Sequence, residues 1–161
     1  MRLLIDTNVY LEFFLKRENY DSVFGFFQYV ARRNTQTCVS AMSLRDFGYI
    51  MHKYLHDNDL TKKLQLKVYE MTSKVINTSA DAAIESLYSE STDYEDSLQT
   101  VAAEESMCDA IVTFNKKDFE NSKLPVFTPN ELIQIWNKCD WCPVIKKQAH
   151  LSACFYYSNL N

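Results

Sequence analysis

Glycine and proline are scarce in this chain of 161 residues, which has 2 glycines and 3 prolines. This scarcity argues against an all-β protein, which needs many turn residues, and against a glycine-rich phosphate-binding loop. No stretch reaches the roughly 18 apolar residues of a membrane-spanning helix, and the opening MRLLIDTN is too short and too acidic for a signal peptide. The 5 cysteines are an odd number, so they cannot all pair, and reduced thiols in a cytoplasmic protein are expected.

An excess of positive charge is also missing, because the net charge is -4. A polyanionic partner would therefore need a local basic surface, or metal ions, acting against the overall field. The length and the 47% hydrophobic composition are sufficient for one domain with a complete core.

Apolar runs typical of strands alternate with segments whose apolar residues recur at helical spacing. Strands are predicted at 2–6, 35–40, 74–77 and 109–114 and in the short segment PVF, and helices at 9–17, 21–33, 41–55, 61–73, 80–89, 93–106 and from 129 onward. Predicted helix caps are Asp21, Ser40, Ser79 and Thr128, the last with Pro129 and Glu131 in a capping box. This alternation predicts an α/β fold with a parallel sheet covered on both faces.

Acidic side chains follow the strands at the edge where chemistry gathers in such folds. Asp6 ends the first strand, Asp118 follows the strand at 109–114, and Asp93 and Asp96 begin a helix. Each also has a plain structural interpretation as a helix cap or a surface charge. Asp46 lies two turns into its helix, where the alternative is a solvated side chain or a partner for Arg45 or Lys53.

Carboxylates that converge in one cleft repel one another and need a compensating cation. Oxygen ligands without His or Cys suit Mg²⁺ or Mn²⁺. A site of this kind could hold one or two ions and support phosphodiester hydrolysis.

The segments LLIDTNVYLEFFL, SAMSLRDFGYI, DYEDSLQTVAAEESMCDAIVTFNKKDF and PVFTPNELI resemble, in order and spacing, the PIN domain, in particular its VapC-type toxin ribonuclease branch. The resemblance covers roughly residues 2–136. It implies a three-layer α/β/α sandwich, a metal-dependent endoribonuclease acting on RNA, and an antitoxin protein as partner. A homodimer is compatible with it.

The resemblance also implies roles for individual residues. Asp6, Asp46, Asp96 and Asp118 match the family's catalytic and metal-binding acids, and the supporting positions are Asn8, Asp93, Thr113 and Asn115. Two positions depart from the common pattern. Asp46 replaces a longer Glu, so that a metal contact there would run through water, and Asn115 replaces an Asp.

Other classes fit less well. A haloacid-dehalogenase-type phosphatase needs a second Asp where Asn8 stands, and a receiver domain needs paired acids at its first strand. His52 and His56 fit a solvated helix face. The main alternative is a non-catalytic PIN-like module that binds RNA or a partner. For RNA contact the nearest basic residues in sequence are Arg45, Lys53, Lys116 and Lys117.

Two units are expected, a nuclease domain at 1–136 and a C-terminal extension at 137–161. Cys139, Cys142, His150 and Cys154 could in principle bind zinc, but the spacing matches no familiar zinc motif. The aromatic content of the extension predicts an ordered segment with free thiols, docked on the domain or on a second subunit.

Overall fold

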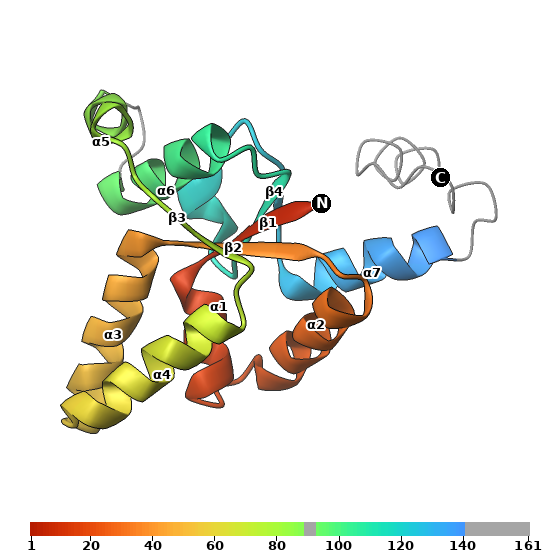
Figure 1. Ribbon diagram of the computed structural model, residues 1–161. Coiled ribbons are helices and arrows are strands. Elements are labelled where there is room, and N and C mark those ends of the chain that lie inside the picture. Colours follow the sequence, from red (N-terminus) through yellow and green to blue (C-terminus); the bar gives the residue numbers. More distant parts are fainter. Residues whose placement is uncertain (89–92, 141–161) are drawn as a thin grey trace.

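The sheet is parallel throughout, as the sequence predicts. The computed structural model describes residues 1–88 and 93–140, and its five strands lie in the order β3-β2-β1-β4-β5 (Figure 1). The strands are β1 (Arg2–Ile5), β2 (Gln36–Ser40), β3 (Lys74–Ile76), β4 (Ala110–Val112) and β5 (Val126–Phe127). The predicted strands are therefore confirmed, with ends that differ by a few residues.

Helices cover both faces of the sheet and make three layers (Figure 1). One face carries α1 (Thr7–Phe14), α2 (Tyr20–Arg32), α3 (Ala41–Leu55), α4 (Asn58–Glu70) and α7 (Pro129–Asp140). The other carries α5 (Ala80–Leu87), α6 (Tyr94–Glu105) and the short 3₁₀ helix η1 (Lys116–Phe119). This is the predicted α/β/α sandwich.

The central strand β1 is buried on both faces. Leu3 and Ile5 belong to the larger core under α1, α2, α3 and α7, whereas Leu4 points into the smaller core under α6. The alternation follows from the two-residue period of a strand. Because both faces of β1 are covered, its carboxyl end is held firmly, and Asp6 is the residue that follows this end.

Most predicted helix starts are confirmed by their capping bonds. The hydroxyls of Ser40 and Ser79 accept hydrogen bonds from the amides of Ser43 and Ala82. Thr128 and Glu131 form the reciprocal capping box, at 2.8 and 3.3 Å. Three starts are displaced from the predicted positions, and the first of these is α1, which begins at Thr7 instead of residue 9. Asn19, rather than Asp21, is the cap residue of α2, and α4 begins at Asn58 because Asp57 accepts from the Leu60 amide.

Among the helices that the structure describes, none is both long and apolar enough to cross a membrane. The predicted docking of the C-terminal extension and its free thiols concern residues 141–161 and the side chains just before them, which lie outside the described residues.

Candidate active site

Two neighbouring strands deliver polar side chains to one edge of the sheet. β1 and β4 pair in parallel with Ile5 beside Val112, and the Asp6 amide donates to the Val112 carbonyl at 3.0 Å. The residues that follow the two strands, Asp6 and Thr113, therefore lie side by side. The Thr113 hydroxyl donates to Asp6 Oδ2 at 2.7 Å.

Asp6 is a buried carboxylate, with 5% of its surface exposed. It occupies the N-cap position of α1, yet its side chain makes no capping hydrogen bond. Burial raises the pKa of Asp6, and the Thr113 hydroxyl and the nearby amides of Thr7 and Asn8 oppose this shift. The hydrogen bond of ordinary geometry that the Asp6 side chain makes thus comes from Thr113, at the end of the neighbouring strand, and not from an amide of α1.

Asn8 and Asn115 orient the Thr113 hydroxyl. Asn8 Nδ2 and the Asn115 amide both donate to Thr113 Oγ1, each at 2.9 Å. Since a hydroxyl has one proton, and two donors occupy its lone pairs, that proton is directed to Asp6. Asn8 is held in turn by the amide of Phe114, which donates to its Oδ1 at 3.2 Å.

Asp96 lies in the first turn of α6 and faces the other acids. Burial, followed by the charges of Asp6, Asp93 and Asp118, raises the pKa of Asp96 to about 7. Asp93 itself is the cap of this helix, because its Oδ1 accepts from the amides of Glu95 and Asp96 at 2.9 and 3.3 Å. It supports the position of Asp96 and adds negative charge nearby.

Asp118 reaches the same group from η1. Its carboxylate accepts a hydrogen bond from Asn115 Nδ2, and a hydrogen bond between Asp118 and Asp96 contributes to the raised pKa of Asp96. Asp6, Asp96 and Asp118, which come from three different elements, are therefore brought together. We call them the carboxylate group.

Asp46 makes a different contact. Its Oδ1 forms an ion pair with Arg45 at 2.6 Å, and this hydrogen bond is the main reason why the pKa of Arg45 is raised. Asp46 is not among the charges that act on Asp6 or Asp96. These contacts agree with the structural interpretation of Asp46 as a partner for Arg45.

Most of the basic residues predicted to contact RNA already interact with other side chains of the protein. Lys116 pairs with Glu131 at 3.0 Å, and the Lys53 ammonium lies 4.3 Å from the centre of the Tyr49 ring. Within 1–88 and 93–140, Lys117 has no such ion pair and its side chain is exposed.

A buried polar side chain that sequence reasoning missed also lies against the carboxylate group. Gln99 is on α6, three residues after Asp96, and its amide nitrogen lies 3.5 Å from Asp96 Oδ1. Its amide oxygen accepts from the Ser43 hydroxyl at 2.9 Å. The spacing of three residues places Asp96 and Gln99 on the same face of the helix, and this spacing is the feature of the sequence that indicates their proximity.

The carboxylate group suits a hard divalent cation in its chemistry. Its donors are all oxygens, and the charges of Asp6 and Asp118 add to burial in raising the pKa of Asp96, because no positive charge compensates them. In the described part of the chain, however, no three His, Cys, Asp or Glu side chains are arranged as a ready metal site. Mg²⁺ commonly binds through one or two carboxylates and keeps several waters, so Asp6 and Asp96 fit that mode.

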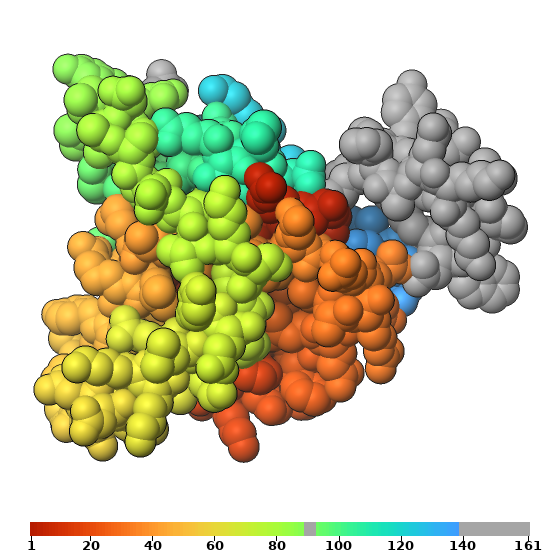
Figure 2. Space-filling view, in the orientation of Figure 1, coloured from red at the N-terminus to blue at the C-terminus, as the bar shows by residue number. Residues whose placement is uncertain are grey.

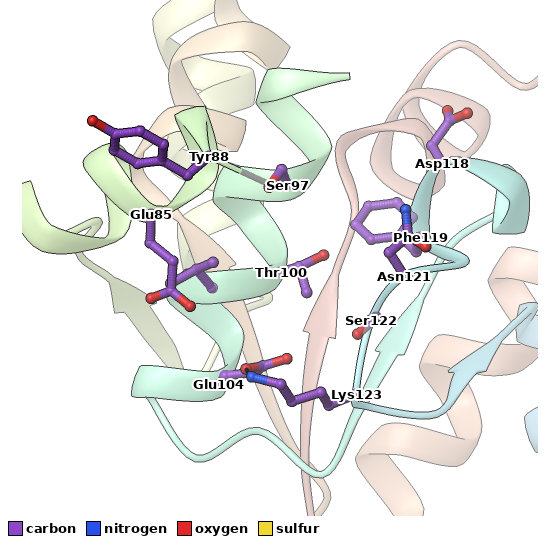
Figure 3. Close-up of a pocket in the computed structure, with 11 residues that line it drawn as sticks. Glu85, Tyr88, Ser97, Thr100, Glu104, Asp118, Phe119, Asn121, Ser122 and Lys123 are labelled. Carbon is purple, nitrogen blue, oxygen red and sulfur yellow. Dashed lines mark hydrogen bonds and ion pairs between the residues drawn. The ribbon is translucent and has the colours of Figure 1, made fainter. Parts of the chain in front are cut away.

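A cavity of about 270 Å³ adjoins the carboxylate group (Figure 3). Ser97, Thr100 and Val101 of α6 form one wall, and Asp118 and Phe119 form the wall opposite. Glu104 and Lys123 meet at one end of the cavity, where they form an ion pair at 3.3 Å. The cavity and the carboxylate group share Asp118.

The sequence comparison identifies the family. The sequence model described as "PIN domain" matches residues 2–117, and the chain belongs to this family. A comparison with curated proteins gives no match.

Solved structures have the same fold. A chain of VapBC2 from Rickettsia felis, bound to a DNA fragment from its promoter, has TM-score 0.61 at 18% identity, with 78% of this chain and 97% of that chain covered. A chain of FitAB bound to IR36 DNA has TM-score 0.62 at 14% identity, with coverage of 79% and 94%. A toxin–antitoxin complex from Klebsiella pneumoniae gives 0.56 at 24% identity, with coverage of 79% and 97%.

Proposed function

We propose that this PIN domain protein is an Mg²⁺- or Mn²⁺-dependent endoribonuclease of the cytoplasm and the toxin of a toxin–antitoxin pair. The observation that carries the proposal is the convergence of Asp6, Asp96 and Asp118 at the carboxyl edge of the sheet. Family membership supports nuclease chemistry. The toxin–antitoxin complexes among the structural neighbours support the proposed partner.

In this proposal Asp6 and Asp96 would hold the cation, with Asp118 beside them. A divalent ion at this place supplies water activation and charge neutralisation for phosphodiester hydrolysis. The chain's own contribution is orientation. Thr113 fixes one oxygen of Asp6, and Asn115 fixes one oxygen of Asp118, so both side chains are restrained before a cation would bind. An RNA strand bound there would pass the cavity beside Asp118.

The helical pair α3 and α4 offers an exposed aromatic surface that supports partner binding. These two helices form one corner of the molecule, in orange and yellow (Figures 1 and 2). Tyr49, Tyr54 and Tyr69 are all more than half exposed there. Large exposed aromatic side chains on two neighbouring helices are candidates for contact with a partner.

A non-catalytic PIN-like module that binds RNA or a partner is the competing function, and the lack of a ready three-ligand site in the described residues favours it. The deciding experiment incubates purified protein with mixed single-stranded RNA, with Mn²⁺, with Mg²⁺ or with EDTA. Internal cleavage that needs the metal supports the nuclease. Binding without cleavage under all three conditions supports the module.

Asp46→Asn is expected to lower the cleavage rate by about 10- to 100-fold without abolishing it. This is the range for residues that act on a metal through an intermediate group, and Asp46 is paired with Arg45 rather than with the carboxylate group. Initial rates at saturating Mn²⁺ give the measurement. A complete loss, equal to that of Asp6→Asn, would instead make Asp46 a direct ligand.

Lys117→Gln is expected to weaken RNA binding and to reduce the slope of log affinity against log salt by about 0.7, the value for one contact to a single strand. Lys117 follows the Asn115 that orients Asp118, and no acidic side chain in the described residues neutralises it. Binding is measured in EDTA, so that cleavage does not interfere. Lys67→Gln, which alters a Lys on α4 paired with Glu70, is the control. An unchanged slope would remove Lys117 from the contact surface.

A further inference from the structure

The side chain of Gln99 links α6 to α3 beside the carboxylate group. It projects from α6, is 8% exposed, and reaches Ser43 in the first turn of α3. Its amide nitrogen lies 3.5 Å from Asp96 Oδ1, and a hydrogen bond from the Gln99 side chain is among the interactions that lower the pKa of Asp6. One buried neutral side chain thus contacts two of the three carboxylates and a helix that contributes none of them.

The orientation of this amide is set by a chain of buried hydroxyls. Ser40 Oγ caps α3, because it accepts a hydrogen bond from the Ser43 backbone amide. The hydroxyl oxygens of Ser40 and Ser43 are 2.8 Å apart. Since Ser43 Oγ donates its proton to Gln99 Oε1, the proton between the serines must come from Ser40. Ser40, Ser43 and Gln99 form one directional chain, which ends with the Gln99 N–H groups turned toward the acids.

The direction has an electrostatic cause. Ionised carboxylates can only accept hydrogen bonds, so the group between Asp6 and Asp96 must present donors to both. The NH₂ of a glutamine has two protons, one for each acid. If the amide turned over, its oxygen would face two anions, and the Ser43 hydroxyl would lose its acceptor. Ser43 therefore selects the amide orientation that both acids require.

We infer that Gln99, oriented by Ser43, is a positioning residue that holds the carboxylates of Asp6 and Asp96 at a fixed separation for a divalent cation. The inference rests on the proposed metal-dependent function. Gln99 supplies donors and no ligand charge. Its role is to restrain the two acids, which would otherwise move apart under their mutual repulsion.

The test measures Mn²⁺ binding by titration calorimetry, at fixed pH and without RNA. Gln99→Met keeps the length of the side chain and removes its donors, whereas Ser43→Ala keeps the amide and removes what orients it. Both are expected to weaken Mn²⁺ binding by about 10- to 100-fold, the scale for groups that orient metal ligands.

Gln65→Met is the matched control. Gln65 also uses its amide nitrogen in a helix–helix contact, a bond to the Leu44 carbonyl at 3.0 Å, but it does not touch the acids. Its loss should leave Mn²⁺ affinity within about twofold of the wild type. Melting temperatures measured without metal separate a general loss of stability from a loss of affinity.

Wild-type affinity in Gln99→Met would overturn the inference. If that variant does not fold, Ser43→Ala decides, and unchanged affinity in it has the same consequence. Mn²⁺ binding that depends on Gln99, in a protein that does not cleave RNA, would contradict the nuclease function and support the positioning role. A wild-type protein that binds no Mn²⁺ would overturn both.

Discussion

Asp6→Asn is expected to abolish metal-dependent RNA cleavage, with a loss of at least about 1,000-fold, equivalent to roughly 4 kcal/mol in the barrier. The change removes the charge from the most buried member of the carboxylate group while it keeps the shape of the side chain. The Asn oxygen can still accept from Thr113, so the local hydrogen bond is retained. Asp96→Asn should have the same effect. Initial rates with Mn²⁺ and RNA give the measurement, and growth arrest on expression in bacteria tests the toxin role.

Asp57→Asn is the control for the chemistry of this substitution. Asp57 caps α4 and lies outside the carboxylate group, so the variant should cleave RNA at the wild-type rate. The Asp6 and Asp96 variants should be as stable as the wild type or more stable. Each removes a carboxylate charge that is costly to bury, and the Asp96 variant also removes repulsion from the neighbouring acids. A large fall in melting temperature in both would instead indicate that their main role is structural.

The sheet and the location of the site follow from the sequence for clear physical reasons. LLI followed by Asp6 and AIV followed by Thr113 are buried strands that end in a polar residue, and parallel strands bring such ends to one edge. Thr113 and Asp6 do hydrogen bond across that edge. The caps of α3, α5 and α7 were equally predictable, since each depends on residues three apart.

Other features depend on contacts that sequence spacing does not encode. Asp46 and Arg45 are neighbours in the chain, and whether they pair depends on side-chain conformation. Gln99 follows Asp96 at helical spacing, but its link to Ser43 joins residues 56 positions apart. Without that link, a glutamine in the middle of α6 is an ordinary helix residue. The orientation of its amide arises only when α3 and α6 pack beside the same strand ends.

The second large effect is expected in the pH dependence of stability without metal. The raised pKa of Asp96, about 7, means that the folded state keeps this proton after the unfolded chain has released it near 3.8. The folded state therefore loses stability relative to the unfolded state as the pH rises through this interval. Near pH 4 the Asp96→Asn variant, whose side chain never ionises, should have the same free energy of unfolding as the wild type. It should be more stable by about 1–2 kcal/mol at pH 8, after allowance for solvent screening, or roughly 2–8 °C in melting temperature.

Added Mn²⁺ should reverse this dependence, since the cation binds the ionised acids in place of the proton. Below pH 7 the apparent affinity should rise by about tenfold per pH unit, and above it the affinity should level off, because the proton of Asp96 no longer competes. Calorimetric titrations in two buffers of different ionisation enthalpy would measure the protons released, close to one per ion at pH 6. Melting curves with Mn²⁺ and with EDTA give the stability in parallel. Affinity that is constant from pH 5.5 to 8, with no proton release, would show that the cation does not bind at Asp96.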